Sequence, residues 1–149
     1  TGDTGDKVHI IAHRGNISGA EPNKENSPEY LLTAMAFGFD AEVDVWYIDK
    51  KWFLGHDSPT YEVSQGFFDA RMWLHCKNIE AVEQLQKTNL NWFWHENDVM
   101  TQTSKGHIWC FPKNYIQNGI TVHLGAPTKS YPKLYGVCTD YALLWRKYA

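Results

Sequence analysis

Short apolar runs alternate with polar segments along the chain, and many of the runs are rich in β-branched and aromatic residues. Apolar runs of this length, bounded by turn-forming residues, are typical of buried β-strands. The segments between the runs are candidates for helices and loops. The pattern predicts strands at residues 9–12, 39–47, 52–54, 73–78, 92–94, 107–111, 121–124 and 134–138.

Helical spacing is confined to a few of the segments between the runs. The clearest start is at Ser27 and Pro28, where a capping residue precedes a proline at the first helical position. Apolar residues then follow at helical spacing as far as Gly38, which ends the helix. Further helices are expected at 79–88 and 142–148, with a short one near 66–71. Strands that alternate with helices or loops favour a mostly parallel sheet.

Composition and charge narrow the class of protein. The chain has 149 residues, which is enough for one domain with a single core. Its formal net charge of −3 gives no reason to expect nucleic acid or an anionic membrane surface as a partner. No apolar run approaches the roughly 18 residues of a membrane span, so we expect no integral membrane segment. Each of the three cysteines lies in an apolar run, which favours buried free thiols over disulfides.

The first seven residues differ in character from the rest of the chain. They are polar, and the glycines at positions 2 and 5 fit two Gly-X-Y triplets. We therefore divide the chain into a disordered or collagen-like segment, residues 1–7, and a single domain, residues 8–149. No secretion signal is visible, which favours a cytoplasmic protein. If the triplets are real, the domain would instead belong to a homo-oligomeric fibre, such as a virion fibre.

Two carboxylates interrupt the apolar run at 41–45. Glu42 and Asp44 are two residues apart, so in a strand both point to one face, while Val43 and Val45 point to the other. Neighbouring carboxylates repel unless a cation lies between them, and a divalent ion with oxygen ligands commonly fills this role. An acidic, half-exposed strand face is the alternative for the pair taken alone.

Several short motifs surround this pair in a fixed order. They are His13-Arg14-Gly15, Glu25-Asn26-Ser27, Glu42-x-Asp44 and His56-Asp57, followed more weakly by Lys77 and Thr139-Asp140-Tyr141. In order and spacing the set resembles the glycerophosphodiester phosphodiesterase family, within the phospholipase-C-like phosphodiesterases, in a short form. The resemblance implies a TIM barrel and metal-dependent hydrolysis of a phosphodiester bond next to glycerol.

A TIM barrel typically needs about 250 residues, and this chain has 149. The expected fold class is therefore α/β, a compact and shortened TIM barrel whose outer helices are reduced. His13 and Arg14 follow the first predicted strand, which would place them at the carboxyl-terminal mouth of such a barrel.

The resemblance also implies a metal site, and here the chain departs from the family. The Glu-x-Asp pair would bind the metal, and the usual third ligand is a glutamate two residues before a lysine. In this chain that position is His75, with Lys77 after it. We expect Glu42, Asp44 and His75 to bind one divalent ion, magnesium or calcium. The alternative is that His75 is a core histidine that binds nothing.

The remaining roles follow from the resemblance and from side-chain chemistry. His13 and His56 would be the general acid and base, because histidine can donate or accept a proton near neutral pH. Other residues would bind the phosphate or the substrate: Arg14, Lys77, Glu25, Asn26 and Trp109. Some of these residues have alternative roles. Glu25 would orient Arg14, or Glu25 and Asn26 together would support the start of the helix. Trp109 would belong to the core. Asp140 is expected to cap the last helix.

Three functions compete. The first is hydrolysis of a small glycerophosphodiester or of a glycerophosphate polymer, which would release glycerol phosphate and an alcohol. The second is a lysophospholipase D-like reaction on a lipid, which would need an exposed apolar rim. The third is a non-catalytic barrel that serves as a binding module on a fibre, which the complete set of chemical groups disfavours.

Overall fold

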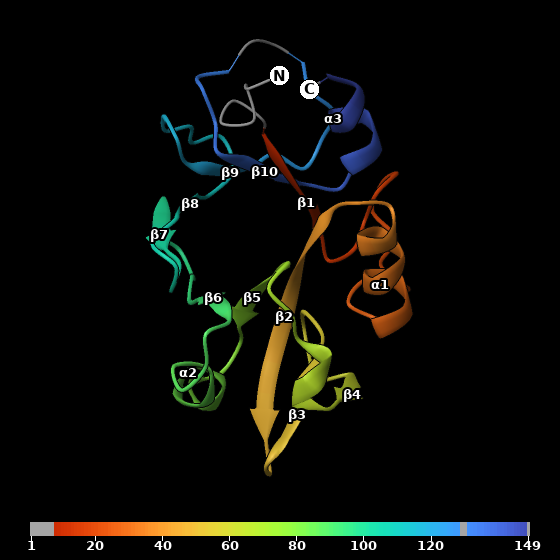
Figure 1. Ribbon diagram of the computed structural model, residues 1–149, viewed down its shortest axis with the longest axis vertical. Helices are drawn as coiled ribbons and strands as arrows, with labels where there is room; N and C mark the ends of the chain where they lie inside the picture. The colour runs from red at the N-terminus through yellow and green to blue at the C-terminus, as the bar shows by residue number, and fades with distance from the viewer. Residues whose placement is uncertain (1–7, 129–130, 149) are drawn as a thin grey trace.

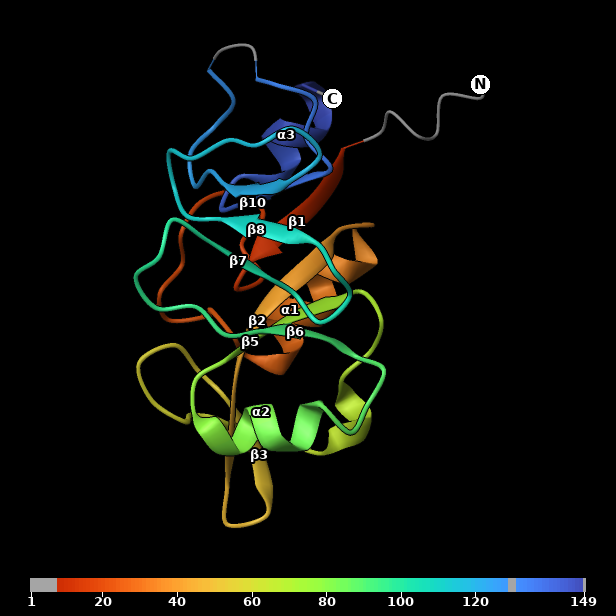
Figure 2. The same cartoon turned by 90° about the vertical axis from the view of Figure 1, so that its left-hand side faces the viewer.

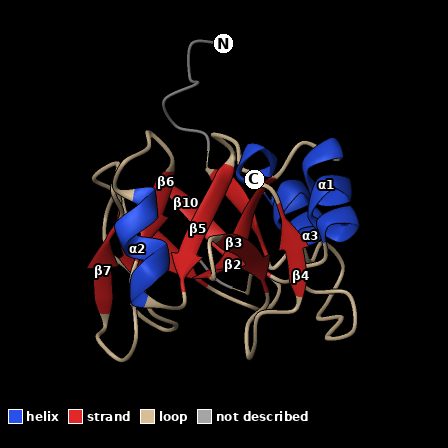
Figure 3. Ribbon diagram, turned by 90° about the horizontal axis from the view of Figure 1, so that it is seen from below, coloured by secondary structure: helices blue, strands red, loops and turns tan. Residues whose placement is uncertain are grey.

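The computed structural model describes residues 8–128 and 131–148 of the chain. These residues form one curled, mixed sheet of ten strands, a half-barrel, with three short α-helices outside the curl (Figure 1, Figure 3). The segment predicted to be disordered or collagen-like, residues 1–7, lies outside the described residues.

The strands run in the spatial order β6-β5-β2-β1-β10-β9-β8-β7, and β3 and β4 branch from the far part of β2. Their bounds are β1 His9–His13, β2 Asp40–Ile48, β3 Lys51–Leu54, β4 Tyr61–Val63, β5 Met72–Cys76, β6 Asn91–Phe93, β7 Met100–Gln102, β8 Ile108–Cys110, β9 Ile120–Val122 and β10 Gly136–Thr139. Neighbours from β6 to β8 pair in parallel, whereas β2–β3, β3–β4 and β7–β8 are antiparallel. The β2–β3 hairpin extends away from the rest of the sheet (Figure 2).

The helices are short and each begins where the sequence provides a start signal. In α1 (Pro28–Ala36) the Ser27 hydroxyl accepts a hydrogen bond from the Tyr30 N–H, as the predicted cap requires. Asn78 caps α2 (Ile79–Leu85) in the same way. The third helix, α3 (Ala142–Tyr148), packs on β1. The helix expected near 66–71 is a single 3₁₀ turn, η2 (Gln65–Phe67).

The expected TIM barrel is wrong. In the described residues no α-helix follows β6, β7, β8 or β9, so helices do not alternate with strands in the second half of the sheet. The connections there are too short or too interrupted for a covering helix: 94–99, 103–107, 111–119 with Pro112, and 123–135 with Pro127 and Pro132. Instead Ser104 closes the free edge of β6, because its N–H donates to the Trp92 carbonyl and its hydroxyl to the Leu90 carbonyl.

The two faces of β2 belong to different environments. Val43 and Val45 are fully buried in the cluster under β3 and α2, while Glu42 and Asp44 face the inside of the curl, as strand alternation predicted.

The inside of the curl is filled by stacked rings. His75 stacks on Phe93 with ring centroids 4.8 Å apart, Phe93 stacks on Trp109 at 4.5 Å, and Trp109 contacts Trp73. The same column continues through His107 and Tyr135 to His9 at the amino-terminal ends of the strands.

One further prediction is confirmed within the described residues. Cys76, Cys110 and Cys138 are buried free thiols. No described helix has the length and apolar character needed to cross a membrane.

Candidate active site

The carboxyl-terminal ends of the parallel strands surround two adjoining cavities. The smaller, about 190 Å³, lies inside the curl, and most of the predicted site residues line it: His13, Arg14, Glu42, Asp44, His56, His75 and Trp109. The larger, about 460 Å³, is lined by Glu25 and Asn26 and shares His13, Arg14, His56 and Leu124 with the smaller. Lys77 lines neither cavity, and its backbone N–H donates to the Val45 carbonyl.

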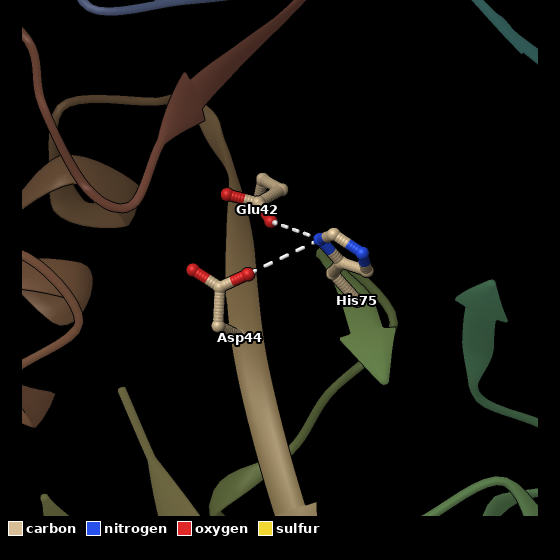
Figure 4. Close-up of side chains that lie close together, drawn as sticks. All are labelled: Glu42, Asp44 and His75. Atoms are coloured by element: carbon tan, nitrogen blue, oxygen red, sulfur yellow. Dashed lines mark ion pairs between the residues drawn. The ribbon is translucent and has the colours of Figure 1, made fainter. Parts of the chain in front are cut away.

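Three acceptor atoms of residues that line the smaller cavity converge, one each from Glu42, Asp44 and His75 (Figure 4). The parallel register of β2 and β5 sets Asp44 beside His75, and the His75 Nδ1 atom lies 3.2 Å from Asp44 Oδ1 and 3.6 Å from Glu42 Oε2. The other ring nitrogen of His75, Nε2, is 3.1 Å from the His95 carbonyl, to which it must donate. Nδ1 of a neutral His75 therefore has no proton, so a positive charge is needed between the three atoms.

That positive charge is either a proton or a metal ion. Burial lowers the pKa of His75, but the hydrogen bonds and charges of Asp44 and Glu42 outweigh burial and raise it to about 9. Burial conversely raises the pKa of Asp44, and the hydrogen bonds from His75 and Asn26 together with nearby positive charge lower it strongly. Without a metal, the site at neutral pH is a buried imidazolium between two carboxylates.

The same three residues fit a divalent cation. Their ligand atoms all lie within 4.8 Å of one another, and the spacings of 3.2 and 3.6 Å are close to the ~3.0–3.5 Å between adjacent ligands of a six-coordinate ion. Asp44 Oδ1 is buried and has no partner other than His75 Nδ1, 3.2 Å away, so beside a neutral His75 it is available to an ion. The Nε2–H bond to the His95 carbonyl fixes the ring orientation, as an outer-shell partner of a metal ligand does.

Asn26 positions Asp44. Its side-chain N–H donates to Asp44 Oδ2 at 2.9 Å, and its side-chain oxygen accepts from the Asp44 backbone N–H at 3.0 Å. Asn26 is buried and has a φ of 68°, a left-handed conformation that asparagine tolerates better than most residues. These two bonds fix the position of the Asp44 carboxylate. The predicted roles of Asn26 were substrate binding and support of the helix start.

The carboxylate partner of His13 is Asp140, which was expected to cap the last helix. The register Ala12↔Thr139 of β1 and β10 brings the next residues together, and His13 Nδ1 lies 2.8 Å from Asp140 Oδ1. Burial lowers the pKa of His13, but the hydrogen bond to Asp140 and the charge of Glu42 raise it above its ordinary value. Asp140 thus orients His13, and the predicted helix cap does not account for its side chain.

Arg14 occupies a strained turn at the end of β1. Its φ is 55°, uncommon for a residue other than glycine, and its N–H donates to the Glu42 carbonyl. Its guanidinium donates to Glu25 at 3.2 Å, so Glu25 orients Arg14, one of the two roles open for it. The Arg14 Nε atom is 3.6 Å from Asp44 Oδ2 and makes no hydrogen bond. This geometry holds a cation at the edge of both cavities.

His56 lies on a loop that only glycine allows to turn. Gly55 has a φ of 152°, and a Cβ there would be 2.0 Å from the Ser58 carbonyl oxygen. His56 Nδ1 is 2.8 Å from Asp57 Oδ1, and His56 lines both cavities. Each predicted acid–base histidine therefore has a carboxylate on Nδ1, which leaves Nε2 as its nitrogen for proton transfer.

Trp109 is a wall of the cavity and part of the core. It is 4% exposed and stacks on Phe93, so it has little surface to offer a substrate. More exposed apolar side chains, Phe111 and Leu124, form the rim. No protein-family model, curated protein or solved structure matches this chain, so its function has to be inferred from its own residues and their geometry.

Proposed function

We propose that this protein hydrolyses a phosphodiester bond next to glycerol and that it uses one divalent ion, magnesium or calcium, bound by Glu42, Asp44 and His75. The observation that carries the proposal is the convergence of both histidines, Arg14 and the three ligand residues on one cavity. These residues support phosphodiester hydrolysis, and the place of glycerol beside the bond rests on the motif resemblance alone, since the fold is not the barrel that the resemblance implied.

The chemistry divides among the residues by charge and proton position. A bound divalent ion would stabilise negative charge on the phosphate oxygens, and Arg14 would add a second cation suited to phosphate. One histidine takes the proton from the attacking water as the water oxygen bonds to phosphorus. The other donates a proton to the alkoxide as the phosphorus–oxygen bond breaks. Because the pKa of His13 is raised, His13 suits proton donation, and His56 would be the base.

The experiment is a divalent-metal titration of chelator-treated protein with bis(p-nitrophenyl) phosphate and glycerophosphocholine. We expect no turnover in excess chelator and recovery with magnesium or calcium, with glycerol phosphate released from the second substrate. The variant His75→Ala loses one metal ligand, so it should need a higher metal concentration for the same rate. It can still reach that rate, because it keeps both acid–base histidines. Full activity in excess chelator would exclude a freely exchangeable catalytic ion.

A lipid substrate is the second candidate, and the cavity rim favours it. Phe111 is 44% exposed and Leu124 is 38% exposed, and both line the smaller cavity. Apolar side chains at a rim fit the acyl chain of a lysolipid. Higher turnover of a micellar lysolipid than of glycerophosphocholine would favour this candidate, and the substitution Phe111→Ser should lower only the micellar rate.

A further inference from the structure

Asn16 is a fully buried polar residue just beyond the strained turn at Arg14. It is 0% exposed, and its backbone N–H donates to the His13 carbonyl at 2.9 Å. The turn packs closely on α1, because a Cβ at Gly15 would lie 2.8 Å from the Tyr30 ring. No predicted strand, helix or motif includes Asn16, whereas the structure encloses its side chain.

The side-chain nitrogen of Asn16 joins two carboxylates. Nδ2 donates to Asp140 Oδ1 at 2.9 Å and to Glu25 Oε2 at 2.9 Å. Each carboxylate has a second partner in the proposed machinery: Asp140 bonds His13 at 2.8 Å, and Glu25 bonds Arg14 at 3.2 Å. A continuous chain of hydrogen bonds thus runs from the proton-transfer histidine, through Asn16, to the phosphate-binding arginine.

The chemistry of this position demands an amide. Both donors of Nδ2 face carboxylate oxygens, and Oδ1 accepts from the Tyr30 hydroxyl at 2.8 Å and from the Glu21 N–H at 3.2 Å. The amide orientation is fixed, because Oδ1 in the place of Nδ2 would put an acceptor against two carboxylates. An aspartate would add a third negative charge, and a serine would supply one donor in place of two.

We infer that Asn16 is a positioning residue that sets Asp140 and Glu25, and through them His13 and Arg14, in one fixed arrangement. This inference rests on the proposed function for its kinetic consequences, but its geometry does not depend on that function. The competing explanation is that Asn16 only stabilises the loop after β1, as any satisfied buried amide does.

The test compares Asn16→Ala with a control that weakens the same region without touching the hydrogen-bond chain. Ser27→Ala removes the α1 cap and should lower Tm while leaving kcat and KM unchanged. Asn16→Ala should lower kcat and raise KM, together reducing kcat/KM about 10- to 100-fold, the usual cost of losing an outer-shell partner. Adding Asn16→Ala to Asp140→Ala should lower kcat little further, and adding it to Glu25→Ala should raise KM little further.

A readout that needs no activity keeps this inference separate from the proposed function. In metal-free protein, nitrogen NMR of His13 should show the Nδ1–H form bonded to Asp140, and Asn16→Ala should disturb that signal while Ser27→Ala leaves it unchanged. Wild-type kinetics and an unchanged His13 signal in Asn16→Ala would overturn the inference. If wild type lacks phosphodiesterase activity, the His13 signal alone decides. If Asn16→Ala does not fold, Tyr30→Phe, which removes one bond to Oδ1, takes its place, with the same two outcomes.

Discussion

Two histidines in one column of rings, His75 at one end and His107 near the other, have pKa values that move in opposite directions. Both contact aromatic rings, His75 stacking on Phe93 and His107 lying at a tilt to Tyr135, and burial lowers the pKa of each. The pKa of His75 nevertheless rises to about 9 because two carboxylates face it, whereas the positive charge of His9 lowers that of His107 further. The comparison shows that charged neighbours decide which of the two rings gains basicity, because burial acts on both in the same direction.

The largest effect should come from the two cavity histidines, His13 and His56, at the carboxyl-terminal ends of the strands. His13→Ala and His56→Ala should each reduce turnover about 100- to 10,000-fold, the usual cost of losing a general acid or base. His107→Phe, at the other end, keeps an aromatic ring in the column and should retain wild-type turnover. Initial rates measured on variants with native circular dichroism test this contrast. If His13→Ala keeps wild-type turnover, that histidine has been misassigned.

The next effect concerns the carboxylate that sets the pKa of His75. Asp44→Asn removes a negative charge at nearly constant volume, so a divalent ion loses a ligand and His75 loses the partner that raises its pKa. We expect metal affinity to fall by more than the roughly 10- to 100-fold that outer-shell substitutions cost. Calorimetric titration with magnesium, calcium and manganese measures it, with Asp57→Asn as a solvent-exposed control. Equal metal affinities of wild type and Asp44→Asn would mean that Glu42, Asp44 and His75 form an ion-pair cluster that binds no metal.

The stability of the metal-free protein should fall as the pH rises from about 6.5 to about 9. Below pH 6.5 His75 is protonated in both the folded and the unfolded chain, and its ion pairs contribute fully. Above it the unfolded chain releases the proton first, so the contribution is lost as the pH approaches the folded pKa of about 9. The whole change is worth about 3 kcal/mol, and the raised pKa of His13 adds to it in the same direction. Urea unfolding across this range should show the loss, and His75→Phe should remove the part that His75 contributes and leave the part that His13 contributes.

The smallest effect belongs to His107 and has the opposite sign. Because its pKa is lowered in the folded protein, the unfolded chain binds the proton more readily, and stability falls as the pH drops below 6.5. His107→Phe should reduce that loss on the acid side and leave the alkaline side unchanged. Urea midpoints at pH 5 and pH 7 measure this, and an unchanged acid loss would show that other groups cause it.

Much of the local structure could be predicted from the sequence, because it depends on short-range pattern. The apolar runs located eight of the ten strands, and Ser27-Pro28 located the start of α1. Two short strands, β4 and β7, were not predicted. Each is three residues long, mixes polar and apolar side chains, and is not fully buried. The expectation of a barrel with covering helices came from the family resemblance. The pattern itself did not support these helices, because the later connections are short or contain proline.

The candidate site could be predicted only as far as side chains on one strand or one motif determine it. Strand alternation placed Glu42 and Asp44 on one face, and the family motif added the residues around them. The contact between His13 and Asp140 depends on the register of β1 and β10, which strand periodicity does not contain. Asn16 gave no signal at all, because its importance arises from two carboxylates that are distant in sequence.

The ring column under His75 has a consequence for the order of events in turnover. Phe93 and Trp109 pack beside His75 inside the curl and line the small cavity that Glu42, Asp44 and His75 also line, so an ion would reach its site through that cavity. It must enter through the same opening as the substrate, and a phosphodiester seated above it would block its escape. Under the proposed function the ion therefore binds first and leaves last, and a chelator added after saturating substrate should inactivate the protein more slowly than one added before.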